Sequence, residues 1–310
     1  MKIAFVYPGQ GAQKIGMAKD FFDEFQSSKD MVAEASQASG IDMEALLFEE
    51  NDKINITEYT QPALVTACMV ITEQIRKEGI TPDITAGLSL GEYCSLNLAG
   101  AMTFFDAVRL TRLRGSLMSN TVPAGEGTMA AVVGLTAEVI EDTIKDLDGV
   151  TCANFNCPGQ IVITGKTESV KEACGLLTEA GARKVVPLTV SGPFHSPMLK
   201  PAGDALRKEL DKSEISSLKI PYIANCNAEI VTDPSKIKDL LQTQVYSPVR
   251  WEQTLLKMKE WGVDVFIEIG PGKTIAGFVK KTVPEIPVIN VSTLEDLRAL
   301  KGKLAELENK

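Results

Sequence analysis

The chain has 310 residues, of which 44% are hydrophobic and 24% are charged, and its formal net charge is −9. This composition is typical of a globular protein with one large domain and room for a smaller one, and it excludes the disordered and fibrous classes. The acidic balance argues against nucleic acid or an anionic membrane as the main partner.

The cysteines and the N-terminal residues indicate the cellular compartment of the protein. The six cysteines form no C-x-x-C pair and do not cluster with the single histidine, so we expect reduced thiols, no disulfide framework and no metal site. The apolar run between Lys2 and Pro8 is too short for a signal peptide, and no run is long enough to span a membrane. We expect a cytoplasmic protein, and nothing in the sequence requires more than a monomer.

The first predicted element is a buried strand at residues 3–7, a short apolar run that favours a mostly parallel sheet. A glycine-rich loop follows at 8–13. It is not a dinucleotide-binding fingerprint, because the third glycine of that motif would fall on Lys14. Helical patterns then cover roughly 28–48 and 60–78, the second with Pro62 in its first turn.

A nucleophile elbow is predicted next, at Gly87-Leu88-Ser89-Leu90-Gly91. An apolar run at 83–86 leads into it as a strand, and 90–98 leads out as a helix. The glycines of G-x-S-x-G allow a sharp turn that exposes the serine hydroxyl, and the helix directs its first N–H groups to the same place. A further helix, predicted from about 103 to 120, carries Arg109, Arg112 and Arg114.

The pattern changes at about residue 124, where strands and helices follow in the order β-α-β-β-α-β. The predicted strands are 128–135, 150–156, 160–164 and 183–190, and the predicted helices are 136–147 and 168–180. This order is the ferredoxin-like arrangement. We therefore predict an α/β fold in which a small domain, 124–194, is inserted into a large hydrolase-like domain formed by 1–123 and 195–310.

The α/β pattern resumes after Pro201. The predicted helices are 202–212 and 249–261, and the predicted strands are 220–224 and 263–269. A Gly-Lys-Thr sequence at 272–274 follows the last strand, but a phosphate-binding loop would need its first glycine at Ile267. We therefore expect no such loop.

The elbow serine needs a base, because a serine hydroxyl is a poor nucleophile at neutral pH. His195 is the only histidine, so it has to be that base if Ser89 is activated by histidine. The alternative is a structural histidine. The glycine and prolines around His195 place it in a loop at the junction of the two domains, where clefts form, and this favours the enzyme.

Several short motifs indicate a protein family, which composition and periodicity alone do not. In chain order they are Pro8-Gly9-Gln10-Gly11-Ala12-Gln13, Thr60-Gln61-Pro62, Gly87-Leu88-Ser89-Leu90-Gly91-Glu92-Tyr93, Arg114-Gly115, Asn154-Phe155-Asn156, Gly192-Pro193-Phe194-His195-Ser196 and Glu268-Ile269-Gly270-Pro271-Gly272. Together they resemble the malonyl-CoA:acyl carrier protein transacylases of fatty acid synthesis, over essentially the whole chain. Members of that family share a hydrolase-like α/β domain with a ferredoxin-like insertion.

The resemblance implies a two-step acyl transfer without metal or cofactor, from malonyl-CoA to the phosphopantetheine thiol of acyl carrier protein. Ser89 would be the nucleophile and His195 its base. The backbone N–H groups of Leu90 and Gln10 would hold the oxyanion. The resemblance also implies that a backbone carbonyl near 248–251, and no carboxylate, orients the histidine. Leu88 stands where many members carry histidine, a difference that we expect to affect packing only.

The resemblance also assigns substrate contacts. Arg114 would bind the malonyl carboxylate through both guanidinium branches, and the ring of Phe194 would crowd an α-methyl group and so favour malonyl over methylmalonyl. Asn154 and Asn156 would help to order the cleft. An acidic carrier protein needs a local positive patch on this acidic chain, and we expect it at Arg183-Lys184, with Lys280-Lys281 as the second candidate.

Three alternatives stay open at this point. A serine thioesterase or lipase would use the same elbow and histidine, although no acidic triad member stands out between them in the sequence. A discrete loading acyltransferase of a polyketide synthase would share every motif. A non-enzymatic scaffold would keep the fold, but the retention of Ser89, His195, Arg114 and the glutamine loop speaks against it.

Overall fold

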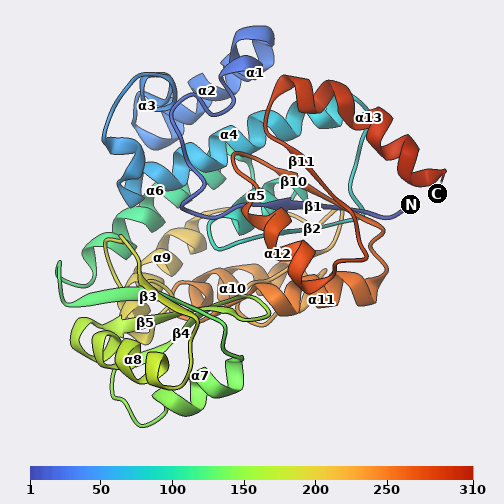
Figure 1. Cartoon of the computed structure of the whole chain (residues 1–310). Coiled ribbons are helices and arrows are strands. Elements are labelled where there is room, and N and C mark those ends of the chain that lie inside the picture. The colour runs from blue at the N-terminus through green and yellow to red at the C-terminus, as the bar shows by residue number, and fades with distance from the viewer. Residues whose placement is uncertain (310) are drawn as a thin grey trace.

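The computed structural model describes residues 1–309 and contains two sheets (Figure 1). A cavity lies between the smaller sheet and the loops that follow strands of the larger one. The larger sheet has the strand order β11-β10-β1-β2-β7-β8, and all its neighbours are parallel except β7 and β8. Its strands are β1 (Ile3–Tyr7), β2 (Ile84–Gly87), β7 (Tyr222–Ile223), β8 (Ile230–Val231), β10 (Val265–Ile269) and β11 (Val288–Val291). This confirms the predicted mixed α/β fold with a mostly parallel sheet.

Helices cover both faces of the larger sheet. They are α1 (Lys19–Glu24), α2 (Gln26–Ser39), α3 (Met43–Phe48), α4 (Thr57–Lys77), α5 (Gly91–Leu98), α6 (Phe104–Asn120), α9 (Lys200–Lys212), α10 (Ile237–Gln244), α11 (Trp251–Trp261), α12 (Thr274–Thr282) and α13 (Leu294–Glu308). Alternate residues of β1 enter different cores: Phe5 and Tyr7 join the core that contains α4, and Ala4 and Val6 join the core of α11 and α12. A strand buried on both faces explains the continuous apolar run at 3–7.

The long helical pattern predicted at 28–48 is two helices in the structure. Gly40 ends α2 with φ 67°, a left-handed conformation that glycine adopts at little cost. The Asp42 side chain then caps α3 by accepting from Ala45 N at 3.0 Å.

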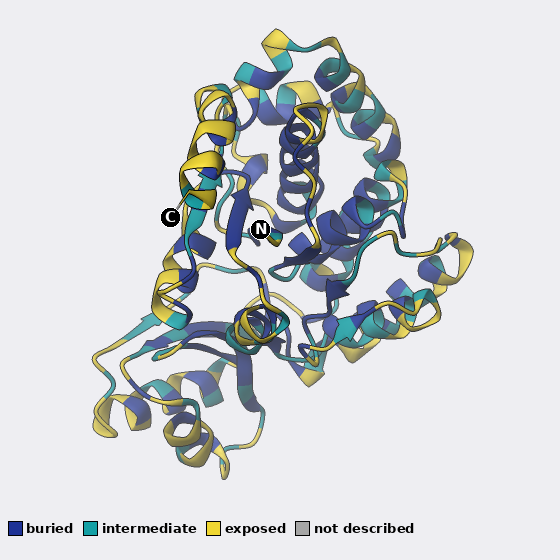
Figure 2. Ribbon diagram, turned by 90° about the vertical axis from the view of Figure 1, so that its right-hand side faces the viewer, coloured by how far each residue is buried: buried dark blue, intermediate teal, exposed yellow. Residues whose placement is uncertain are grey.

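Helix α4 begins three residues earlier than predicted, so Pro62 lies in its interior. Proline has no N–H for the carbonyl four residues before it, which is that of Glu58. Arg112 Nη1 donates to this carbonyl at 2.9 Å, and thus α6 supplies the bond that Pro62 cannot make. Helix α4 is largely buried (Figure 2).

No helix among residues 1–309 is both long and apolar enough to cross a membrane.

The smaller sheet has the order β6-β3-β5-β4-β9. Its first four strands pair antiparallel, and with helices α7 (Ala137–Ile144) and α8 (Thr167–Glu179) they agree with the predicted β-α-β-β-α-β order. The strands are β3 (Gly127–Val133), β4 (Val150–Cys157), β5 (Gln160–Lys166), β6 (Lys184–Pro187) and β9 (Val249–Arg250). β6 is half as long as predicted. β9 lies after residue 194, outside the predicted insertion, and pairs parallel with β4. The domain boundaries 123/124 and 194/195 stay a prediction.

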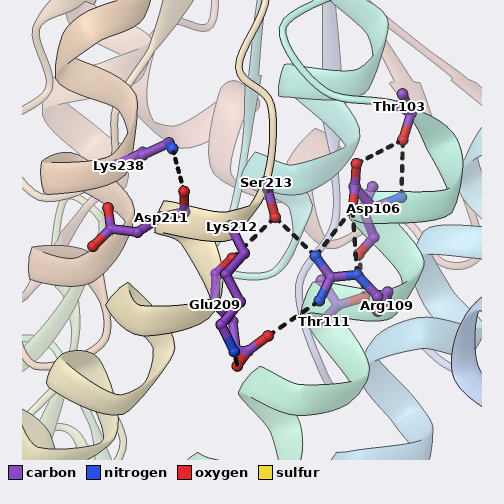
Figure 3. A network of polar contacts seen from close by, with 10 residues as sticks. Thr103, Asp106, Arg109, Thr111, Glu209, Asp211, Lys212, Ser213 and Lys238 are labelled. Atoms are coloured by element: carbon purple, nitrogen blue, oxygen red, sulfur yellow. Dashed lines mark hydrogen bonds and ion pairs between the residues drawn. The ribbon is translucent and has the colours of Figure 1, made fainter.

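Helix α6, which carries Arg114, is tied to α9 by a polar network (Figure 3). Arg109 forms ion pairs with Asp106 on its own helix and with Glu209 on α9, and it donates to Ser213 Oγ at 2.8 Å. Arg109 is therefore a structural residue that fixes α6.

Candidate active site

The elbow forms between β2 and α5, with Ser89 in a left-handed conformation at φ 53°. Both flanking glycines are required by close backbone approach. A Cβ on Gly87 would lie 2.0 Å from the carbonyl of Gly91, and a Cβ on Gly91 would lie 2.8 Å from the carbonyl of Tyr7. Only glycine fits at either position, and the strained turn lifts Ser89 toward the cleft.

Side chains from remote segments hold both main-chain groups of Ser89. Its N–H donates to Asn225 Oδ1 at 2.6 Å, and its carbonyl accepts from Gln244 Nε2 at 2.9 Å. Asn225 follows β7, the strand beside β2, and also donates to the Gly87 carbonyl at 2.8 Å. These bonds offset the cost of the unusual serine conformation.

His195 lies within hydrogen-bond distance of the serine: Ser89 Oγ and His195 Nε2 are 2.8 Å apart. The other ring nitrogen, Nδ1, lies 2.8 Å from the Gln244 carbonyl. Because a carbonyl only accepts, Nδ1 carries the proton and Nε2 is free to accept one from Ser89. The orienting group is a backbone carbonyl near 248–251, as expected: it belongs to Gln244, at the end of α10, a helix that the sequence did not reveal.

Burial and the positive charge of Arg114 lower the pKa of His195 to about 4, against the backbone carbonyls of Gln244 and Ser247, which favour the protonated ring. The imidazole is therefore neutral at physiological pH, which is the form that a general base needs.

Arg114 projects from α6 to the same point and is 1% exposed. Its Nη2 donates to Ser89 Oγ and to Gln244 Oε1, both at 3.0 Å, and its Nη1 donates to Gln61 Oε1 at 2.7 Å. Burial lowers its pKa, yet a guanidinium stays charged in proteins. The site thus holds a fixed cation beside the serine hydroxyl.

A buried carboxyl group completes this polar cluster. Glu92, one turn after the serine on α5, is 1% exposed and accepts at Oε2 from Gln244 Nε2 at 2.7 Å and from Asn225 N at 3.1 Å. Burial raises its pKa to about 7, while its hydrogen bonds and the charge of Arg114 act in the opposite direction.

The cluster opens into a cavity of about 370 Å³ between the two sheets. Its wall includes the predicted residues Gln10, Leu90, Phe194, Asn154 and Asn156. Since Asn225 already occupies the N–H of Ser89, the N–H of Leu90 is the next group along the elbow that can face a substrate oxygen. Gln10 lies in the first loop, and its side chain is anchored to Thr57 Oγ1 at 3.0 Å.

The two predicted basic patches lie outside the cavity. Arg183 and Lys184 are exposed at the start of β6, and Leu188 and Val190 beyond that strand line the cavity. Lys281 is exposed on α12 and donates to Gln160, another residue of the cavity wall, at 3.2 Å.

Sequence reasoning missed the residues that hold the site together. Gln61 and Glu92 stood inside quoted motifs but had no role assigned to them. Asn225 and Gln244 stood in no motif at all, and a lone amide side chain gives no spacing signal from which its partners could be inferred.

Comparison with known proteins shows the same fold and a related sequence. The family model described as acyl transferase domain matches residues 4–302. A malonyl CoA-acyl carrier protein transacylase of Bacillus subtilis (strain 168) is 44% identical over 310 residues, which is 98% of either chain. A malonyl CoA-acyl carrier protein transacylase structure from Clostridium perfringens ATCC 13124 matches with TM-score 0.96 and 43% identity, over 99% of this chain and 98% of that one. A type II PKS acyl-carrier protein in complex with its malonyl-transacylase matches with TM-score 0.94 and 37% identity, over 100% of both chains.

Proposed function

The chain belongs to the acyl transferase family and, within it, to the malonyl CoA-acyl carrier protein transacylases, and from this premise we propose how its residues carry the malonyl group. It transfers malonyl from malonyl-CoA to acyl carrier protein, the step that supplies fatty acid synthesis. The observation that carries the proposal is the convergence of Ser89, His195 and Arg114 at one end of a single cavity.

In the first half-reaction, Ser89 Oγ attacks the thioester carbonyl carbon of malonyl-CoA while His195 Nε2 takes the hydroxyl proton. The backbone N–H groups of Leu90 and Gln10 stabilise the tetrahedral oxyanion, and one such donor is worth about 10²–10³ in rate. The carbon–sulfur bond then breaks, and the proton on His195 passes to the departing CoA thiolate. The product is a malonyl ester of Ser89.

The second half-reaction runs the same steps in reverse on a different thiol. His195 accepts the proton of the phosphopantetheine thiol, whose sulfur attacks the malonyl ester. Collapse of the oxyanion breaks the bond to Ser89 Oγ, which takes the proton back from His195. The neutral ring that burial enforces suits both directions, because it takes and returns one proton in each half.

Arg114 recognises the free carboxylate of malonate. Its guanidinium is planar and charged, and a carboxylate can accept from two of its N–H groups at once. Phe194, which lines the cavity one residue before the base, limits the space around the α-carbon. Asn154 and Asn156 line the same cavity and order its wall.

The carrier protein docks where its phosphopantetheine arm can enter the cavity. Arg183 and Lys184 are our first candidate, because the segment that follows them forms cavity wall, and Lys280 with Lys281 is the second. A polyketide carrier is the alternative partner, supported by the malonyl-transacylase that is similar to this chain and was solved with a type II PKS acyl-carrier protein. A cytoplasmic location, a monomeric state and the absence of a cofactor stay predictions.

Mass spectrometry after brief exposure to malonyl-CoA tests the proposal. We expect a malonyl adduct on Ser89, no adduct in Ser89→Ala, and discharge of the adduct on addition of carrier protein. Release of free malonate at the same rate with and without the carrier protein would instead identify a hydrolase.

A further inference from the structure

One residue contacts all three residues that the proposed reaction uses, two through its side chain and one through its main chain. Gln244 is fully buried at the end of α10. Its Nε2 donates to the Ser89 carbonyl, its Oε1 accepts from Arg114 Nη2, and its main-chain oxygen accepts from His195 Nδ1.

The orientation of the Gln244 amide decides what Arg114 meets. A carboxamide has one accepting and one donating end, and a reversed amide would place its NH₂ group against the guanidinium, donor against donor. The observed orientation is the one in which the oxygen faces the cation.

Glu92 selects that orientation. Its Oε2 meets two N–H donors, Asn225 N at 3.1 Å and Gln244 Nε2 at 2.7 Å. A carboxylate oxygen at this place attracts the NH₂ end of the amide and repels its oxygen. The Ser89 carbonyl acts in the same direction, since it also accepts from Nε2 at 2.9 Å.

We propose that Gln244, oriented by Glu92, is a positioning residue that holds Arg114 and His195 in place beside Ser89. By holding Arg114 there, it sets the preference for a substrate that bears a carboxylate. The neutral amide holds the guanidinium by one ordinary hydrogen bond, so the cation keeps its charge for the substrate. A carboxylate in the place of this amide would pair with Arg114 directly and compete with malonate for it.

The test is Gln244→Glu, assayed with malonyl-CoA and with acetyl-CoA, which lacks the carboxylate. The substitution leaves the main-chain carbonyl at His195 Nδ1 in place, so the ring should keep its orientation. The added negative charge offsets that of Arg114, so the acid limb of the pH profile should move up toward 6.5. We expect kcat/KM for malonyl to fall more than that for acetyl, so that the malonyl-to-acetyl ratio drops about tenfold, mainly through KM for malonyl-CoA. An equal loss for both substrates would mean a merely structural role and would overturn the proposal.

A double variant separates positioning from stability. Gln244→Glu alone places two carboxyl groups face to face, so it should lower Tm. Glu92→Gln together with Gln244→Glu exchanges acceptor and donor between the two positions and should recover part of the lost Tm, although the Asn225 N–H and the Ser89 carbonyl each lose a partner. The ratio should stay low, because a carboxylate still pairs with Arg114. Recovery of both Tm and the ratio would contradict the proposal.

Two further variants keep the test decisive. Gln244→Met adds no charge but removes the acceptor of Arg114 Nη2, and it should also lower the malonyl-to-acetyl ratio; an unchanged ratio would count against the proposal. Gln242→Glu makes the same exchange on the same helix, at a position where the side chain faces Arg207 and Asp204, and it should leave the ratio unchanged.

The proposal rests on the proposed function. A wild type that forms no malonyl-serine refutes that function, whereas normal wild-type malonylation with an unaltered ratio in Gln244→Glu refutes only the positioning role.

Discussion

Arg114 Nη2 lies 3.0 Å from Ser89 Oγ, the oxygen that receives the acyl group in the proposed reaction. The guanidinium and the serine oxygen are thus adjacent, which fits the proposed substrate malonyl-CoA, whose carboxylate and thioester carbonyl are separated by a single carbon atom.

Replacing Arg114 by alanine should impair malonyl transfer selectively. We expect a loss on the order of 3–5 kcal/mol in transition-state stabilisation, comparable to the removal of one partner of a buried ion pair. Acetyl transfer should fall much less. Steady-state kinetics with both thioesters measures the difference, and equal losses would refute the assignment of the carboxylate site to Arg114.

The pH dependence of Ser89 acylation should reflect the lowered pKa of His195. Since the ring is protonated only below about pH 4, the acylation rate with acetyl-CoA should be nearly constant from about pH 8 to pH 5 and then fall about tenfold per pH unit below pH 4. The Arg114→Ala variant removes one of the two causes, so its acid limb should move up toward 6.5, the ordinary value. Rapid-quench mass spectrometry records both profiles, and a wild-type limb already near 6.5 would contradict the mechanism.

Phe194 should control the size of the α-substituent. Phe194→Ala removes a buried ring from the cavity wall, and the ratio of methylmalonyl to malonyl transfer should rise about tenfold or more, the range expected when a small apolar group becomes accommodated. Competition between the two CoA esters gives the ratio directly. Phe278→Leu, which alters the same cavity from α12, is the matched control and should leave the ratio close to that of the wild type.

Charge reversal at the proposed docking patch, Arg183 and Lys184, should affect the kinetics of the carrier protein but not those of malonyl-CoA. Reversing both charges with Arg183→Glu and Lys184→Glu should raise KM for the acidic carrier protein about three- to tenfold, with the difference shrinking at high salt, while KM for malonyl-CoA stays constant. Lys280→Glu with Lys281→Glu tests the second candidate in the same assay. If only the second pair raises KM for the carrier protein, docking belongs to α12; constant carrier kinetics in both variants rejects both patches.

The sequence predicted most of the fold because its signals are local. A continuous apolar run marks β1, and G-x-S-x-G marks the turn between β2 and α5. Three short elements were not predicted: the two-residue strands β8 and β9 and the eight-residue α10. They are too short for periodicity to distinguish, and β9 exists only because β4 is there to pair with it.

The same limit applies to the site. Ser89 and His195 could be paired from sequence because the chain has one elbow and one histidine, and Arg114 could be singled out by a family motif. Gln244 could not, because its importance arises from where α10 ends relative to three other segments. Its contacts are tertiary, and no pattern of neighbouring residues encodes them.

The separation of these groups along the chain has a consequence for biosynthesis. Ser89 precedes its base by 106 residues and Gln244 by 155 residues. A chain interrupted before the end of α10 contains the nucleophile and the arginine, but it lacks the carbonyl that orients the histidine and the amide that holds the cation. We therefore expect incomplete chains not to form the malonyl ester of Ser89, and acylation should begin only when α10 has taken its place in the fold.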